Sequence, residues 1–113
     1  MDPIIILKSV LLVSFLVTGS LKILGANYVR KQFTDFKLNR GAMILFGMIE
    51  ILLAVGLFIE NLAFYASIGL AYTTSAALYK HIKANHRFII MLPAFLLLVL
   101  SMATAILLLK PDF

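Results

Sequence analysis

The stretch that decides the fold reads GAMILFGMIEILLAVGLFI and runs from Gly41 to Ile59. It consists of apolar and small residues with a single carboxylate, Glu50, at its middle. A helix that crosses about 30 Å of hydrocarbon needs about 20 apolar residues, so this stretch predicts a membrane span. A carboxylate at the bilayer centre costs on the order of 3 kcal/mol and normally faces the protein interior. Glu50 is therefore the first candidate for a buried polar or ligand-binding residue.

The rest of the chain has the same apolar character. Its 113 residues are 63% hydrophobic and only 13% charged, whereas a soluble domain is about half apolar and about a quarter charged. Four spans need about 80 residues, and the remainder is too short for a soluble domain. We therefore expect one transmembrane domain over residues 1–113, an all-α polytopic four-helix bundle. Its predicted spans cover residues 3–24, 41–59, 62–79 and 88–109.

The basic residues predict the orientation in the membrane. The net charge is +5, but Lys and Arg concentrate in two connections, residues 25–40 and 80–87, rather than on a polar surface. This pattern argues against nucleic acid as a partner and is typical of charges that orient a membrane protein. Positively charged connections stay in the cytoplasm, so we expect both connections there and both termini outside. The expected location is the cytoplasmic (inner) membrane of a bacterium, in contact with the lipid bilayer.

The residue types exclude several kinds of chemistry. The sequence contains no Cys, which excludes dithiol exchange, iron–sulfur clusters and zinc–thiolate sites within this chain. Its two histidines, His81 and His86, lie in a basic connection with no carboxylate nearby in the sequence. We interpret them as a solvated pair, since a haem between helices would need ligands inside the spans. No catalytic residue, metal site or resident cofactor is predicted, although a quinone is a candidate ligand.

Helical spacing places small residues beside Glu50 on one side of its span. Gly47 and Ala54 share that side, and small residues let another helix backbone approach closely. On the third span, Gly69 and Tyr72 fall on one side together with the other tyrosines of that span. Counted from the turn between the second and third spans, Glu50 and Tyr72 lie at the same depth. We therefore predict a hydrogen bond between the Tyr72 hydroxyl and Glu50 near the midplane.

The first span offers a cation as an alternative partner for Glu50. Thr18, Gly19 and Lys22 share one side of that span. When the facing ends of the first two spans are paired, Lys22 lies about seven residues, or roughly 10 Å, from Glu50 along the axis. We therefore favour a Lys22 side chain that extends to the cytoplasmic interface, while a buried ion pair with Glu50 stays open.

Two strings of the sequence resemble a known family. TGSLKILG covers Thr18 to Gly25, and GMIEILLAVGL covers Gly47 to Leu57. With the basic connection between them, they resemble the DoxX-like family of small four-helix membrane proteins, and the resemblance covers nearly the whole chain. Members of that family are linked to a thiosulfate:quinone oxidoreductase subunit, to membrane complexes against oxidative stress and, in distant eukaryotic relatives, to receptor chaperones or cargo receptors. The positions that match the family are Gly19, Lys22, Gly47 and Glu50.

Three functions fit these observations. The leading hypothesis is a non-enzymatic accessory or scaffold protein that binds a membrane partner, a lipid or a quinone and forms homo- or hetero-oligomers. The first alternative is a membrane subunit of a quinone-linked oxidoreductase, with Glu50 and Tyr72 near the quinone head group. A bound quinone would support that alternative. The second alternative is a small proton-coupled transporter that uses Glu50, which a Glu50-dependent flux would support.

Overall fold

The protein consists of helices, and no strand occurs among the residues that the structure describes. The computed structural model describes residues 2–109, so residues 1 and 110–113 of the predicted domain lie outside the described part. The all-helical class is therefore as predicted. The count of four helices is wrong, because the connection at residues 25–40 contains an additional short helix. The five helices are α1 (Pro3–Leu24), α2 (Asn27–Asp35), α3 (Arg40–Gly56), α4 (Ala63–Lys83) and α5 (Phe88–Leu109).

Two of the helices are long and apolar enough to cross a membrane by themselves. They are α1 and α5, with 22 residues each. Helix α3 has 17 residues, and α2 and α3 pass the same test of length and composition only together, with a bend of 112° between them. Within residues 2–109, length and composition thus indicate two spans, or three if the bent pair forms one. The apolar helices define a membrane protein in contact with lipid, whereas the number of four spans stays a prediction.

The connection from α1 to α3 contains α2 and has a specific residue at each of its ends. Gly25 ends α1 in the left-handed conformation, with φ of 76°, which a residue with a side chain rarely adopts. A Cβ at this position would also lie 2.0 Å from Nη1 of Arg40. Asn39 caps the N-terminus of α3, because its side chain accepts a hydrogen bond of 2.8 Å from the Ala42 amide. The two helices therefore leave the connection side by side and antiparallel.

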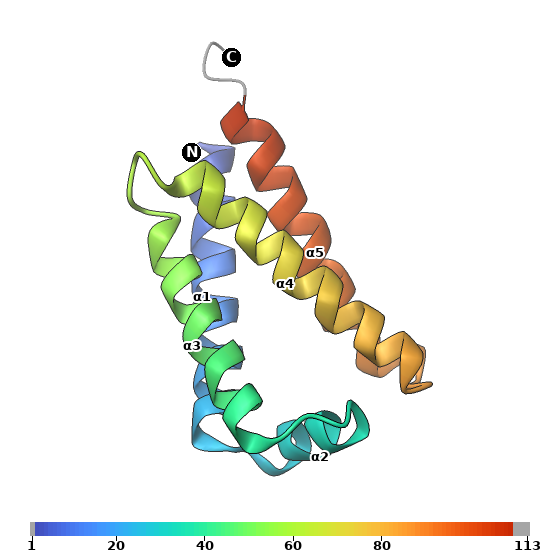
Figure 1. Ribbon diagram of the computed structural model, residues 1–113. Helices are drawn as coiled ribbons and strands as arrows, with labels where there is room; N and C mark the ends of the chain where they lie inside the picture. The colour runs from blue at the N-terminus through green and yellow to red at the C-terminus, as the bar shows by residue number, and fades with distance from the viewer. Residues whose placement is uncertain (1, 110–113) are drawn as a thin grey trace.

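The antiparallel pair α1–α3 is one packing unit of the fold (Figure 1). Its backbones meet at two glycines, since a Cβ on Gly47 would lie 2.6 Å from the carbonyl oxygen of Gly19. A Cβ on Gly19 would likewise lie 2.8 Å from the carbonyl oxygen of Gly47. The side of α3 that helical spacing predicted to be covered is buried over most of its length. Its buried members include Met43, Gly47, Glu50 and Ala54.

The second packing unit is the pair α4–α5, which meets the first unit near the turn between α3 and α4. Both described chain ends lie at that end of the molecule, and the two pairs diverge toward the opposite end, where α2 crosses (Figure 1). Gly69 of α4 lies against α3, because a Cβ there would be 2.9 Å from Cδ2 of Leu53. The buried cluster that joins the two units consists of Leu11, Phe15, Ala54, Leu57, Ala66 and Leu70.

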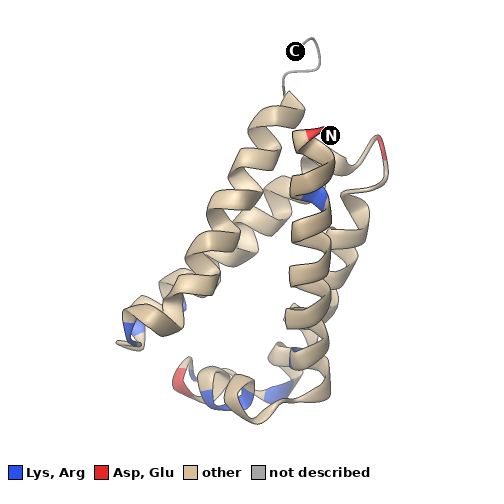
Figure 2. Ribbon diagram, turned by 180° about the vertical axis from the view of Figure 1, so that it is seen from behind, with Lys and Arg blue, Asp and Glu red and all other residues tan. Residues whose placement is uncertain are grey.

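Helix α2 lies at the basic end of the molecule. Val29, Phe33 and Phe36 turn inward and form a second buried cluster with Met43 of α3. Figure 2 shows that Lys and Arg concentrate at this end, around α2 and the connection between α4 and α5. The two basic connections of the sequence therefore lie at the same end of the molecule.

Candidate functional site

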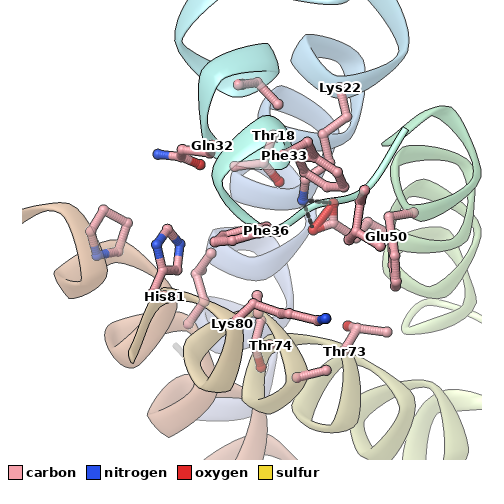
Figure 3. Close-up of a pocket in the computed structure, with 18 of the residues that line it drawn as sticks. Thr18, Lys22, Gln32, Phe33, Phe36, Glu50, Thr73, Thr74, Lys80 and His81 are labelled. Carbon is pink, nitrogen blue, oxygen red and sulfur yellow. Dashed lines mark hydrogen bonds and ion pairs between the residues drawn. The ribbon is translucent and has the colours of Figure 1, made fainter. Parts of the chain in front are cut away.

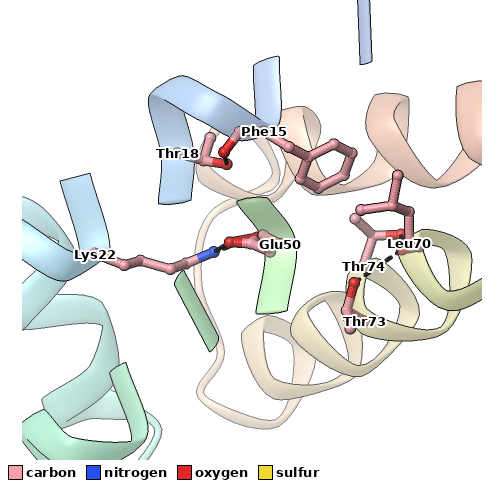
Figure 4. Close-up of polar contacts among 7 residues, drawn as sticks. All are labelled: Phe15, Thr18, Lys22, Glu50, Leu70, Thr73 and Thr74. Atoms are coloured by element: carbon pink, nitrogen blue, oxygen red, sulfur yellow. Dashed lines mark hydrogen bonds and ion pairs between the residues drawn. The ribbon is translucent and has the colours of Figure 1, made fainter. Parts of the chain in front are cut away.

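An ion pair between Lys22 of α1 and Glu50 of α3 forms the polar centre of the protein. The Nζ atom of Lys22 donates to both Oε1 and Oε2 of Glu50 (Figure 4). Glu50 is 6% exposed, and 18% of the Lys22 side chain is exposed. Each charge compensates the other, which lowers the cost of removing either from water. The preference for a Lys22 side chain extended to the interface is therefore wrong, and the alternative of a buried pair is the one observed.

Side-chain direction explains how the two residues bridge the distance along the axis. Side chains on a helix tilt toward the N-terminus of their own helix. Helices α1 and α3 run antiparallel (Figure 1), so this tilt brings Lys22 toward the level of Glu50 and Glu50 toward the level of Lys22. Glycine at position 47 also brings the helices together, since its Cβ would lie 3.0 Å from Cβ of Lys22. The estimate of roughly 10 Å counted backbone rise alone, so it overestimated the gap.

The predicted hydrogen bond between Tyr72 and Glu50 is wrong. Tyr72 is 75% exposed, and Tyr65 and Tyr79 on the same side of α4 are also exposed. Equal depth in the membrane does not determine the direction in which a side chain points. Helix α4 turns its other side toward the protein. That side carries smaller residues, which allow close helix packing and leave the bulky phenols outside. The buried residues of α4 are Ala63, Ala66, Ser67, Leu70, Thr74 and His81.

Three threonines near the ion pair hydrogen-bond to their own helices. The Thr74 hydroxyl donates to the Leu70 carbonyl at 2.7 Å, and the Thr73 hydroxyl donates to the same carbonyl at 3.0 Å (Figure 4). The Thr18 hydroxyl donates to the Phe15 carbonyl at 3.5 Å. A hydroxyl that donates in this way still has oxygen lone pairs free to accept a hydrogen bond. These threonines can therefore accept hydrogen bonds from a bound molecule.

A cavity of about 230 Å³ lies between the two helix pairs, next to α2 (Figure 3). Lys22 and Glu50 line one part of its wall, and Lys80 and His81 of α4 line another. A water molecule takes up roughly 30 Å³ in the liquid, so the cavity has room for a group much larger than water. Tyr72 lies outside this cavity, whereas Thr18 is part of its wall. Its apolar lining includes Phe15, Phe33, Phe36, Phe46, Ile90 and Leu97.

A chain of hydrogen bonds runs from the cavity wall to the surface. Nδ1 of His81 lies 2.7 Å from Nδ1 of His86, and Nε2 of His86 lies 2.8 Å from Oδ2 of Asp35. The interpretation of the histidines as a solvated pair without a carboxylate is wrong, because His81 is 6% exposed. Asp35 comes from α2, 51 residues before His86 in the sequence. The chain therefore joins α2 to the end of α4.

His81 lies beyond the predicted apolar span of α4, and its surroundings favour the neutral ring. Burial lowers the pKa of His81, and the electrostatic effects of His86 and Lys22 lower it further. When both histidine rings are neutral, His86 donates from Nε2 to the Asp35 carboxylate. Nδ1 of His86 then accepts a hydrogen bond from Nδ1 of His81. Phe36 packs edge-on against the His81 ring, with 4.9 Å between ring centroids. Among residues 2–109, no group of three or more His, Cys, Asp or Glu side chains could hold a metal ion.

The apolar helices and the ion pair beside a cavity define an all-helical membrane protein with a polar centre. The model of the DoxX-like family matches residues 6–104 of the 113, and the chain belongs to this family. The resemblance of the two sequence strings is thereby confirmed. The matched range includes both partners of the ion pair and both glycines at the helix contact. No curated protein and no solved structure matches the chain significantly.

Proposed function

We propose that this DoxX-like membrane protein is a non-enzymatic accessory protein that binds a lipid or a quinone in the cavity between its helix pairs. The observation that supports this proposal is the cavity itself, with aromatic side chains from α1, α2 and α3 and a few polar groups in its wall. Binding sites for small molecules are concave and mostly apolar, with a small number of polar groups that orient the ligand. The cavity has these properties.

The polar centre offers a ligand both donors and acceptors. A lysine ammonium has three N–H donors, and Lys22 directs two hydrogen bonds to Glu50. Its third N–H is available to a carbonyl or hydroxyl oxygen of the ligand. Thr18 and Thr74 can accept hydrogen bonds from a ligand hydroxyl, and the phenylalanines can pack against its apolar part. A quinone or quinol ring and a lipid head group each contain groups of this kind.

The proposed setting is the cytoplasmic membrane of a bacterium, crossed four times by α1, α3, α4 and α5. The positive-inside rule places the end with α2 in the cytoplasm and both termini outside. The cavity would then open toward the cytoplasmic half of the bilayer. Large apolar side chains remain exposed along the outer surface, for example Val13, Leu52 and Ile106. Lipid, a second copy of this chain or another membrane protein would cover them, so we expect homo- or hetero-oligomers.

A membrane subunit of a quinone-linked oxidoreductase is the second candidate. The observation that favours it is the chain from Asp35 through His86 to His81, which links an exposed carboxylate to the cavity wall. A quinone takes up protons when it is reduced, and such a chain offers a route for them. A proton-coupled transporter that uses Glu50 has less support, because Lys22 engages both carboxylate oxygens.

Native mass spectrometry of the protein, gently extracted from its own membranes, tests the proposal. Ala77→Phe places a large ring in the cavity wall, and Ser75→Phe adds the same ring on the exposed side of α4 as a matched control. We expect a lipid or quinone bound to the wild type and to Ser75→Phe, and its loss from Ala77→Phe. Circular dichroism of each variant checks that it folds. Equal retention by all three folded proteins would refute binding in the cavity, and a retained redox subunit would favour the second candidate.

A further inference from the structure

We infer that the cavity ligand is an amphiphile with one apolar chain and a negatively charged head group, and that Lys80 binds this head group. The inference rests on the proposed function, because it names the chemical class of the molecule in the same cavity. A neutral quinone or sterol would pack against the apolar wall as well as an anionic amphiphile would. The charges around the cavity decide between them, because they attract an anion and not a neutral molecule.

The cavity wall carries one positive charge without a compensating carboxylate. Lys22 and Glu50 neutralise each other, and the burial of His81 disfavours a charge on that ring. Lys80 also lines the cavity (Figure 3). Among residues 2–109, Glu50 pairs with Lys22 and Asp35 is hydrogen-bonded to His86, and no carboxylate lies within 4.0 Å of the Lys80 ammonium. Lys80 therefore has no acidic partner within that part of the chain.

A bound anion would compensate this charge, because the Lys80 side chain is half-buried in the cavity wall. An ammonium group removed from water is costly unless a partner satisfies it. A carboxylate or phosphate oxygen would form a charge-assisted hydrogen bond with Lys80, which is stronger than a bond between neutral groups. The phenylalanines of α1, α2 and α3 would meanwhile cover the apolar chain of the same molecule. The cavity thus matches both parts of such an amphiphile.

A second cavity provides the approach to Lys80 from the basic end. It measures about 340 Å³, lies between α2 and the connection from α4 to α5, and shares Tyr28, Gln32 and Ile90 with the first cavity. Lys31 and Arg87 line it. Its one carboxylate, from Asp35, is hydrogen-bonded to a histidine. A path lined by cations raises the local concentration of anions, so it favours a charged head group over a neutral one.

Binding of oleate and methyl oleate to the delipidated protein in a nonionic detergent tests the inference by native mass spectrometry. The two probes share one chain and differ in the head-group charge. We expect oleate to bind about tenfold more tightly to the wild type, as the loss of one charge-assisted hydrogen bond predicts. Lys80→Gln should reduce oleate binding to the level of methyl oleate. Arg30→Gln is the matched control, because it removes one exposed charge of α2 outside both cavities.

The outcomes separate this inference from the proposed function. Equal binding of both probes, abolished by Ala77→Phe, would refute the anionic head group and keep the cavity as a binding site. Equal weakening by Lys80→Gln and Arg30→Gln would also refute the role of Lys80, since general electrostatic attraction would then explain the preference. Dodecyl phosphate, as a third probe, distinguishes a phosphate from a carboxylate head group. Binding of none of the probes, together with retention of native lipid that Ala77→Phe does not change, would refute both proposals.

Discussion

Removing Lys22 alone should destabilise the protein more than removing both partners of the ion pair. Lys22→Met keeps a long side chain but leaves Glu50, which is 6% exposed, without its cation. The double variant Lys22→Met/Glu50→Leu replaces both charges by apolar side chains. Breaking a buried ion pair leaves an uncompensated charge, whereas replacing the whole pair by apolar residues is often neutral. The double variant should therefore be more stable than Lys22→Met.

The burial of the two side chains sets the expected size of the effect. Broken buried pairs cost about 3–5 kcal/mol. We expect about 3 kcal/mol for Lys22→Met, the lower end of this range, because 18% of the Lys22 side chain is exposed. Glu50→Leu should cost less, about 1–2 kcal/mol, since the freed lysine can extend to the interface. The double variant should lie within about 1 kcal/mol of the wild type, so the coupling energy should be at least about 3 kcal/mol.

Reversible unfolding in mixed micelles measures these free energies. Sodium dodecyl sulfate is added stepwise to the protein in a nonionic detergent, and helical circular dichroism reports the folded fraction. The four proteins of the double-mutant cycle are compared at one pH and one detergent concentration. If the single effects add to the double effect within about 0.5 kcal/mol, Lys22 and Glu50 do not interact, and the reasoning from the observed ion pair is refuted.

Three further predictions concern the helix contacts and the histidine chain. Gly47→Ala should lower the free energy of unfolding by more than about 2 kcal/mol, because its Cβ would lie 2.6 Å from the Gly19 carbonyl oxygen. Tyr72→Phe should change stability by less than about 0.5 kcal/mol, because this side chain is 75% exposed; the same unfolding assay measures both variants. Acidification through pH 6.5, the ordinary pKa of histidine, should weaken the attachment of α2, measured as lower protection factors for amide hydrogen exchange in α2, each taken relative to the intrinsic rate at that pH. Burial lowers the pKa of His81, so the detached state binds more protons and the attached state loses stability as the pH falls.

Each of these predictions has a control or a contradictory outcome. Gly41→Ala makes the same change on α3 where the nearest atom to the Cβ is 3.4 Å away, and an equal loss there would contradict the glycine contact as the cause. Destabilisation by Tyr72→Phe of more than about 1 kcal/mol would show that another chain covers this residue. The groups that face His81 are His86 and Lys22, with Asp35 behind His86. His81→Asn should therefore remove the pH dependence, and its persistence would assign the effect to another group.

The sequence predicted the covered side of α3 but not that of α4. On α3, the small residues and the single carboxylate mark the same side, and Gly47, Glu50 and Ala54 are all buried. On α4, the tyrosines mark one side but small residues occur on both, so helical spacing could not identify the covered side. The predicted hydrogen bond between Glu50 and Tyr72 rested on their equal depth, which does not determine the direction of a side chain. In the structure, the Glu50 carboxylate forms an ion pair with Lys22 instead.

The sequence predicted part of the site: Lys22, Glu50 and Thr18 line the cavity, whereas Tyr72 does not, and Thr74, Lys80 and His81 of its wall were missed. Lys22 and Glu50 were both candidates, and only the direction of their side chains, which axial rise does not describe, brings them together. Asp35 was missed because its position depends on the folding of α2. A signal for this helix was present, since Val29, Phe33 and Phe36 follow a spacing of four and three residues. The pattern covers too few residues, and too many polar residues lie between them, to predict a helix.

The division of the ion pair between α1 and α3 has a consequence for biosynthesis. Helix α3 has 17 residues, fewer than the about 20 that an independent span needs. A lone Glu50 would add on the order of 3 kcal/mol to its partitioning into lipid. Helix α1 leaves the ribosome first and carries the counter-ion, Lys22, so the carboxylate can meet its partner as it enters the bilayer. We expect α1 to act as an intramolecular chaperone, so that α3 integrates as part of a helical hairpin but is rejected by the translocon when expressed alone.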